Sequence, residues 1–283
     1  MDGALYRSVL YIPGAKSRAL DKSRRLNVDA IIFDLEDAVT PDEKVRARDI
    51  LEEQLAEGGY GHRVKIVRIN GLDTAWGADD ARAVAEMACD AVLLPKTESA
   101  SQIKELANLV PGKAIWCMME TPRGVVNALE VADMPEVEGF VMGTNDLAKD
   151  IGCETGGNRM AMMGSLQMCI LAARAAGIVI VDGVYNAFKD DAGLKSECEQ
   201  GLALGMDGKT LIHPAQVEIT NAVFAPSDQE VALAKRQIAA FEEAEAKGEG
   251  VAVVDGKIVE NLHVVTANAL LAKAEAVAAR DTV

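Results

Sequence analysis

The sequence predicts a (β/α)₈ barrel of the α/β class, followed by a C-terminal helix–hairpin–helix extension. Three observations predict it. Eight short segments rich in β-branched residues recur along the chain, a helical pattern follows each of them, and polar residues stand directly after most of the segments. The length of 283 residues suits one such barrel, although it would also allow two domains of about 140 residues each.

The predicted strands are mostly continuous apolar runs without alternation, which is typical of parallel strands that are buried on both faces. They cover Ser8–Ile12, Ala30–Leu35, Val64–Ile69, Ala91–Pro95, Ile115–Glu120, Gly139–Gly143, Ile178–Asp182 and Asp207–Ile212.

The predicted helices fill the gaps between the strands. Some have clear end signals: Thr40 is a capping residue before Pro41, and Gly177 is a typical C-terminal stop. The helices cover Ser17–Leu26, Pro41–Glu57, Trp76–Met87, Ala100–Leu109, Gly124–Val131, Asn158–Ala176, Ala187–Leu204 and Pro214–Phe224.

The polar residues favour a closed barrel over a doubly wound open sheet. In a barrel the carboxyl ends of all strands meet at one rim, whereas in an open sheet only those near the switch point meet. The residues concerned are Pro13-Gly14, Glu36-Asp37, Asn70, Lys96, Glu120-Thr121, Asn145-Asp146, Asp182-Gly183 and His213. We therefore expect a catalytic barrel over residues 1–226, with its functional side chains at that rim.

The pattern changes after Phe224. A charged, Ala-rich helix is expected at Ser227–Lys247, and Asp255-Gly256 between two apolar runs is a strong hairpin signal. A second Ala-rich helix is expected at Leu262–Ala279. We interpret residues 227–283 as a lid, or as an arm that contacts a neighbouring subunit.

Charge and cysteine content exclude several classes of protein. The net charge of −15 argues against nucleic acid and against an anionic membrane surface as partners. The five cysteines form no C-x-x-C pair, which favours a reducing, cytoplasmic location. No apolar stretch comes close to the roughly 20 residues of a membrane span, and Met1–Arg7 lacks the apolar run of a signal peptide.

Two carboxylates stand at the ends of neighbouring predicted strands. Glu120 ends one strand, and Asp146 follows the next in Gly143-Thr144-Asn145-Asp146. Two carboxylates with water are ligands that Mg²⁺ accepts, and Mn²⁺ is an alternative. The structural alternative is that Asp146 caps a helix and Glu120 pairs with an arginine.

Cations and one histidine supply further candidates. Arg68 lies in a strand that is expected to be buried, so it needs a partner: either a bound carboxylate or carbonyl oxygen, or a salt bridge to Glu36, Asp37 or Glu120. Lys16, Arg18 and Lys22 follow Pro13-Gly14, where a phosphate site and a solvated helix face are both possible. His213 could bind substrate or cap the rim.

Six short segments at strand ends resemble the citrate lyase β-subunit-like branch of the HpcH/HpaI aldolase superfamily. They are Ser8-Val9-Leu10-Tyr11-Ile12-Pro13-Gly14, Asp34-Leu35-Glu36-Asp37-Ala38-Val39, Val67-Arg68-Ile69-Asn70-Gly71, Met119-Glu120-Thr121-Pro122, Gly143-Thr144-Asn145-Asp146-Leu147 and Ile212-His213-Pro214. That branch includes malyl-CoA, β-methylmalyl-CoA and citramalyl-CoA lyases and malyl-CoA thioesterases. The resemblance implies a TIM barrel that assembles as a homotrimer or homohexamer and acts on an acyl-CoA.

The resemblance also implies roles for individual residues. Glu120 and Asp146 would be the Mg²⁺ ligands. Glu36 and Asp37 would lie behind these ligands without binding the ion themselves. Arg68 would grip the substrate. Coenzyme A and substrate contacts would come from Tyr11, Lys16, Lys22, Asn145, Ile212 and His213.

One position departs from the family pattern. Lyases of this branch carry a catalytic aspartate in the C-terminal arm, which reaches a neighbouring subunit's site, and here Glu260 stands in that place. One extra methylene shifts a proton donor by about an ångström, and catalysis is sensitive to such shifts. We expect a Mg²⁺-dependent lyase that cleaves a malyl-CoA type substrate into an acyl-CoA and a 2-oxo acid. A malyl-CoA thioesterase that uses the same site is the first alternative, and a citrate lyase β-subunit is the second.

Overall fold

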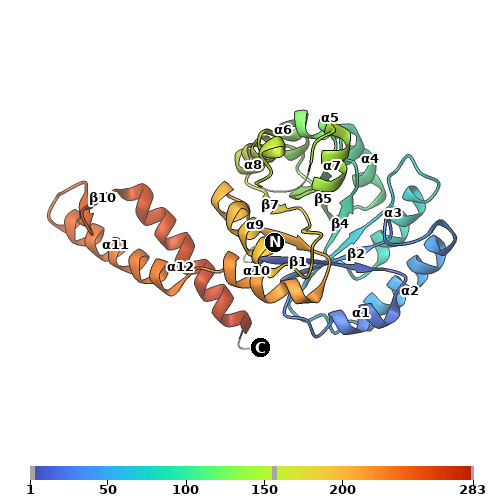
Figure 1. Cartoon of the computed structure of the whole chain (residues 1–283), viewed down its shortest axis with the longest axis horizontal. Coiled ribbons are helices and arrows are strands. Elements are labelled where there is room, and N and C mark those ends of the chain that lie inside the picture. Colours follow the sequence, from blue (N-terminus) through green and yellow to red (C-terminus); the bar gives the residue numbers. More distant parts are fainter. Residues whose placement is uncertain (1–3, 155–157, 282–283) are drawn as a thin grey trace. The chain divides into compact units, whose positions relative to one another are not determined.

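Eight parallel strands close into a barrel in sequence order, which confirms the predicted fold class (Figure 1). The computed structural model describes residues 4–154 and 158–281. The strands are β1 Ser8–Pro13, β2 Ala30–Asp34, β3 Val64–Arg68, β4 Ala91–Leu94, β5 Ala114–Met119, β6 Val137–Met142, β7 Val179–Asp182 and β8 Gly208–Leu211. β1 pairs with both β2 and β8, so the barrel has no open edge.

The α-helices of the barrel follow the strands as expected, with shorter bounds in several places. They are α1 Ser17–Ser23, α2 Lys44–Glu57, α3 Gly77–Glu86, α4 Ala100–Leu109, α5 Pro122–Val126, α6 Ala128–Ala132, α7 Thr144–Ile151, α8 Met163–Ala176, α9 Asp191–Leu204 and α10 Val217–Phe224. Single 3₁₀ turns, η1 Pro41–Glu43, η2 Met160–Met162 and η3 Pro214–Gln216, precede α2, α8 and α10.

Two helix predictions need correction. The helix expected at Gly124–Val131 is two short helices, α5 and α6, which meet at Asn127. The sequence analysis also missed α7, which starts directly after Gly143 and ends on the left-handed Gly152. α7 matters for the site because it carries Asn145 and Asp146 in its first turn.

The main apolar core joins residues of the strands to residues of the surrounding helices. Phe33 and Phe140 of the strands belong to the same buried cluster as Leu20, Leu51 and Ile103 of the helices. Alternate residues of a strand point to opposite faces. Asp34 of β2 lies opposite Arg68 of β3 in the register of the two strands, so both side chains point to the same face of the sheet. Phe33, one residue before Asp34, points to the other face.

The chain divides into two compact units. Tyr6–Phe224 form the barrel, and a second unit begins at Ala225. The second unit consists of α11 Asp228–Ala246, the hairpin β9 Ala252–Val254 and β10 Lys257–Val259, and α12 Asn261–Asp281, shown from orange to red in Figure 1. Its small core contains Phe241, Ala244, Ala252 and Val259.

The last helix requires a correction to the hydropathy analysis. Asn261–Arg280 is one helix of 20 residues with a mean hydropathy of 1.2, so by length and composition alone it could cross a membrane. This is weak evidence for a membrane span, because an apolar helix of a protein that never enters a membrane passes the same test. Leu262 and Val265 are exposed within this unit.

Candidate active site

A cavity of about 410 Å³ lies at the carboxyl ends of the barrel strands. Four carboxylates and one guanidinium are among the described residues that line it: Asp34, Asp37, Glu120, Asp146 and Arg68. Tyr11, Thr144, Asn145, Val184, Thr210 and Ile212 are also part of its wall. The cavity is therefore acidic and attracts cations.

Of the two predicted metal ligands, Glu120 is the more deeply buried. It follows β5, is 2% exposed, and its Oε1 accepts a hydrogen bond from the Lys96 backbone N–H at 2.8 Å. Gly143 leaves room for it, because a Cβ at that position would come within 2.5 Å of Glu120 Oε2. Burial is the main cause that raises the pKa of Glu120 to about 7.

Asp146 reaches the same cavity from the first turn of α7. Its half-buried side chain thus lines the same cavity as Glu120, from the neighbouring strand–helix connection. No group of three or more His, Cys, Asp or Glu that could hold a metal is found among the residues described by the structure.

The two carboxylates nevertheless fit Mg²⁺. This ion usually takes one or two protein carboxylates and fills its other positions with water and substrate oxygens. The raised pKa of Glu120 shows that burial penalises its negative charge, and a bound cation would relieve that penalty. Glu120 and Asp146 are the residues that would hold the ion.

Arg68 ends β3 and lies within a cluster of carboxylates. Its Nε and Nη2 donate to the two oxygens of Asp34 at 2.7 and 2.6 Å, and its Nη1 lies 2.9 Å from Glu36 Oε2. Asp37 is farther away, at 3.8 Å from Nη1. The bidentate partner is thus Asp34, which was not predicted as a partner of Arg68. The salt bridges expected as the structural alternative, to Glu36 and Asp37, are also present.

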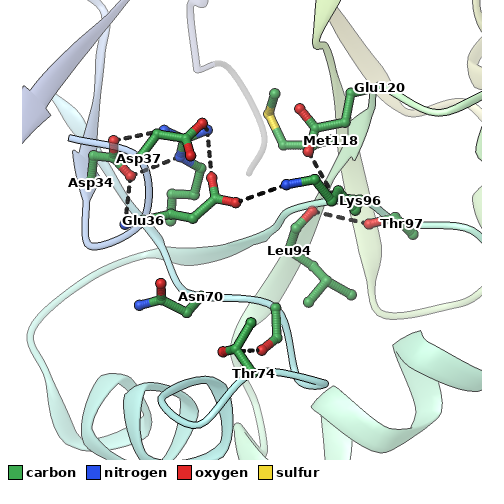
Figure 2. Close-up of polar contacts among 12 residues, drawn as sticks. Asp34, Glu36, Asp37, Asn70, Thr74, Leu94, Lys96, Thr97, Met118 and Glu120 are labelled. Atoms are coloured by element: carbon green, nitrogen blue, oxygen red, sulfur yellow. Dashed lines mark hydrogen bonds and ion pairs between the residues drawn. The ribbon is translucent and has the colours of Figure 1, made fainter. Parts of the chain in front are cut away.

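Glu36 connects Arg68 to Lys96. Glu36 Oε2 lies 2.9 Å from Arg68 Nη1, and Figure 2 shows the other carboxylate oxygen, Oε1, directed toward Lys96 Nζ, 3.4 Å away. Burial raises the pKa of Glu36 despite the opposing effect of Arg68. Asp37 is exposed at the cavity wall.

Three residues that the resemblance assigns to coenzyme A or substrate contacts, Tyr11, Asn145 and Ile212, belong to the cavity wall. The Tyr11 hydroxyl donates to Met118 Sδ at 3.3 Å. The Arg68 guanidinium carbon lies 5.0 Å from the centre of the Tyr11 ring. Asn145 exchanges two amide hydrogen bonds with Asn186, at 2.9 and 3.3 Å.

The remaining predicted residues are not part of the cavity wall. His213 caps η3, where its Nδ1 accepts from the Ala215 N–H at 3.1 Å, and its ring stacks on Phe188. Lys16 and Lys22 are exposed at and within α1. Glu260 belongs to the second unit, where its N–H donates to His263 Nδ1.

Sequence reasoning missed three residues of the site. Asp34 was taken as part of a strand and was given no role, although it opens one of the segments that carry the family resemblance. Asn186 lies in the connection after β7, and no local pattern marks it as the partner of Asn145. Lys96 was noted at a strand end but was given no role.

Comparison with known proteins supplies the family. Residues 7–214 match the model of the HpcH/HpaI aldolase/citrate lyase family, and residues 157–278 match the model of a C–C bond lyase of the TIM-barrel fold.

Relatives cover nearly the whole chain. A (3S)-malyl-CoA thioesterase of Cereibacter sphaeroides is 61% identical over 274 residues, which are 97% of this chain and 96% of the relative. The citrate lyase subunit beta of Escherichia coli K12 is 33% identical over 281 residues, covering 95% and 93%.

Among solved structures, the CitE protein of Mycobacterium tuberculosis in complex with magnesium, acetoacetate and coenzyme A has a TM-score of 0.84. It is 29% identical and covers 96% of this chain and 99% of that one. These matches agree with the resemblance inferred from the strand ends. The chain belongs to the HpcH/HpaI aldolase/citrate lyase family, whose members are enzymes.

Proposed function

We propose that this protein is a Mg²⁺-dependent thioesterase that hydrolyses (3S)-malyl-CoA to malate and free coenzyme A. The observation that carries the proposal is the shared cavity of Glu120, Asp146 and Arg68. The 61% identity to (3S)-malyl-CoA thioesterases, together with Glu260 in place of an arm aspartate, favours hydrolysis over the lyase reaction that the motifs first suggested.

The acidic cavity would receive the polar end of the substrate. Mg²⁺ held by Glu120 and Asp146 would supply Lewis-acid polarisation of the substrate's carboxylate and hydroxyl oxygens. Tyr11, Asn145 and Ile212 would contact the acyl part from the cavity wall, and Lys16 and Lys22 on α1 are candidates for coenzyme A phosphates.

Arg68 would stabilise the negative charge that develops on the thioester oxygen as water attacks the carbonyl carbon. Asp34 accepts from Nε and Nη2, which form one edge of the guanidinium. Nη1, which also lies 2.9 Å from Glu36 Oε2, is the donor that a substrate oxygen would use. The new C–O bond forms, the C–S bond breaks, and the coenzyme A thiolate takes up a proton.

Glu260 from the arm of a neighbouring subunit is our candidate base for the attacking water. Such sharing requires an oligomer, for which we propose a homotrimer or homohexamer, in the cytoplasm. Carbon–carbon cleavage to acetyl-CoA and glyoxylate is the second candidate function, favoured by the match to the C–C bond lyase model and by the citrate lyase relatives.

The test is a product assay with purified protein, (3S)-malyl-CoA and either Mg²⁺ or Mn²⁺. We expect malate and free thiol in equal amounts, without glyoxylate. Glyoxylate with acetyl-CoA and no free thiol would replace the thioesterase by the lyase. A lack of turnover of this and related hydroxy-acyl-CoA esters would contradict both functions.

A further inference from the structure

Lys96 has a backbone conformation that is unusual for a lysine. Its φ is +47°, in the left-handed region that glycine and asparagine enter most easily. The turn around it is fixed by Thr97, which is fully buried, donates its hydroxyl to the Leu94 carbonyl at 3.0 Å and its N–H to the Met118 carbonyl at 3.3 Å (Figure 2). The presence of lysine in a conformation that favours glycine indicates that the lysine side chain has a function at this position.

The backbone and the side chain of Lys96 point to two different carboxylates. The N–H donates to Glu120 Oε1 at 2.8 Å, and the ammonium group lies 3.4 Å from Glu36 Oε1 (Figure 2). Burial lowers the pKa of Lys96, but the carboxylates of Glu36, Glu120 and Asp146 outweigh it and raise this pKa. The backbone thus anchors Lys96 beside Glu120, and the negative charges of the cavity stabilise its ammonium group.

The contact that holds the ammonium group is weak. The Lys96 side chain is 56% exposed, and the long distance to Glu36 describes a weak ion pair. Arg68 contrasts with it, because three carboxylates surround its buried guanidinium. Of these two cations, Lys96 is the one that could leave when another positive charge arrives.

We propose that Lys96 is the resident counter-ion of the acidic cavity: its ammonium group balances Glu36, Glu120 and Asp146 in the metal-free protein and is displaced outward when a divalent cation binds. This inference rests on the proposed metal role of Glu120 and Asp146. It adds that metal binding in this protein is an exchange of one cation for another.

The test measures Mn²⁺ affinity by electron paramagnetic resonance, with Mn²⁺ alone as the probe. Lys96→Gln should bind Mn²⁺ about 3- to 10-fold more tightly than the wild type, because one repelling charge near a divalent ion is removed. Lys96→Arg should restore the wild-type affinity. Lys96→Gly, which relieves the left-handed backbone, should show the same tightening and replaces the glutamine variant if that variant does not fold.

Thermal unfolding supplies a second readout. In the presence of a chelator, Lys96→Gln should unfold at a lower temperature than the wild type, because the carboxylates lose their counter-ion. With saturating Mg²⁺, the two proteins should unfold at the same temperature. Lys104→Gln is the matched control, since Lys104 is an exposed lysine of α4, and it should change neither property.

The outcomes separate this inference from the proposed function. Normal Mn²⁺ binding by the wild type with unchanged affinity in Lys96→Gln overturns the counter-ion role, even if the variant unfolds earlier. If Lys96→Gln raises KM but leaves the Mn²⁺ affinity unchanged, the counter-ion role is also overturned, and Lys96 is a substrate contact instead. A wild type that binds no divalent cation overturns the metal site itself and the exchange with it.

Discussion

Glu120 shows how one buried carboxyl can make metal binding depend on pH. Burial raises its pKa to about 7, so near neutral pH a large fraction of the metal-free protein carries the protonated carboxyl. Only the ionised form can bind Mg²⁺, and the bound ion would in turn lower the pKa. We therefore expect the affinity for Mg²⁺ to rise from pH 6 to pH 8, by up to about tenfold per pH unit below the pKa.

Isothermal titration calorimetry at several pH values in buffers of different ionisation enthalpy would check this. It should also detect proton release on binding, largest below pH 7. Glu120→Gln should remove high-affinity binding at every pH. An affinity that is the same at pH 6 and pH 8 would contradict the link between burial of Glu120 and the metal.

Single residues were predictable where their position in a strand decided their role. Glu120, Asp146 and Arg68 could be named because a polar residue at the end of a buried parallel strand faces the barrel rim. The bidentate link between Asp34 and Arg68 depends on the register of β2 and β3, which the sequence alone does not fix. The positive φ of Lys96 depends on the turn that Thr97 holds, and nothing in the residue type predicts it.

At the scale of elements, β7, β8 and α9 are joined by buried charges. Asp182 at the end of β7 accepts from Lys209 of β8 at 3.0 Å and from Arg159 at 2.7 and 2.8 Å, and Lys209 also reaches Glu197 of α9 at 2.6 Å. Asp182 and Lys209 are both fully buried. Removing one partner of such a network leaves an uncompensated buried charge.

We expect Asp182→Asn to destabilise the barrel by about 3–5 kcal/mol, the usual cost of breaking a buried ion pair. Burial opposes ionisation of Asp182, but Lys209 and Arg159 outweigh it and lower its pKa. The stability that this depressed pKa provides is present above the unfolded-state value of about 4 and is lost as the pH falls through the folded-state value. The difference in free energy of unfolding between wild type and variant should therefore be largest at pH 7 and become smaller in acid.

Denaturant unfolding followed by tryptophan fluorescence would measure this, because both tryptophans, Trp76 and Trp116, belong to the barrel unit. Glu199→Gln is a suitable control, since its ion pair with Lys195 is exposed, lies in the same barrel unit, and exposed pairs contribute little to stability. Equal losses in the two variants would mean that the buried network adds no more than a surface pair.

The connection between β7 and α9 also touches the proposed site. Asn186 and Asn145 exchange two hydrogen bonds, and Asn145 precedes Asp146 in the first turn of α7. Loss of exposed hydrogen bonds of this kind costs about 1 kcal/mol, so we expect Asn186→Ala to lower kcat/KM about 3- to 10-fold with little change in unfolding temperature. Lys189→Ala, in the same connection, should leave kcat/KM unchanged. Equal activity of the two variants would contradict a positioning role for Asn186.

The elements were predictable to the extent that burial dictates them. Continuous apolar runs located all eight barrel strands, and only their ends shifted by a residue or two. α7 was missed because it has only eight residues, so that its apolar residues Leu147, Ala148 and Ile151 span barely two turns. Asn127 lies between α5 and α6, and its side-chain amide donates to the Glu98 carbonyl at 2.8 Å, a contact that single-sequence periodicity does not reveal.

For the whole molecule, the role that we propose for the second unit involves another copy of the chain. Its helix α12 keeps apolar side chains such as Leu262 and Val265 exposed within the unit. Exposed apolar side chains of this kind are typical of surfaces that another protein covers. The predicted arm that contacts a neighbouring subunit would use this surface and bring Glu260 to a barrel other than its own.

Subunit mixing tests that arrangement. Glu120→Gln removes the proposed metal ligand from the barrel, and Glu260→Ala removes the proposed base from the arm, so each variant alone should be inactive. If a site combines the barrel of one subunit with the arm of another, co-expression in equal amounts should restore about one quarter of the wild-type activity. Half of the barrels and half of the arms are intact, and random pairing brings an intact barrel and an intact arm together in about one quarter of the sites. Mixing wild type with the Glu120→Gln/Glu260→Ala double variant gives the reference for dilution. Activity no greater than the sum of the two parents would mean that Glu260 serves its own barrel or takes no part in the reaction.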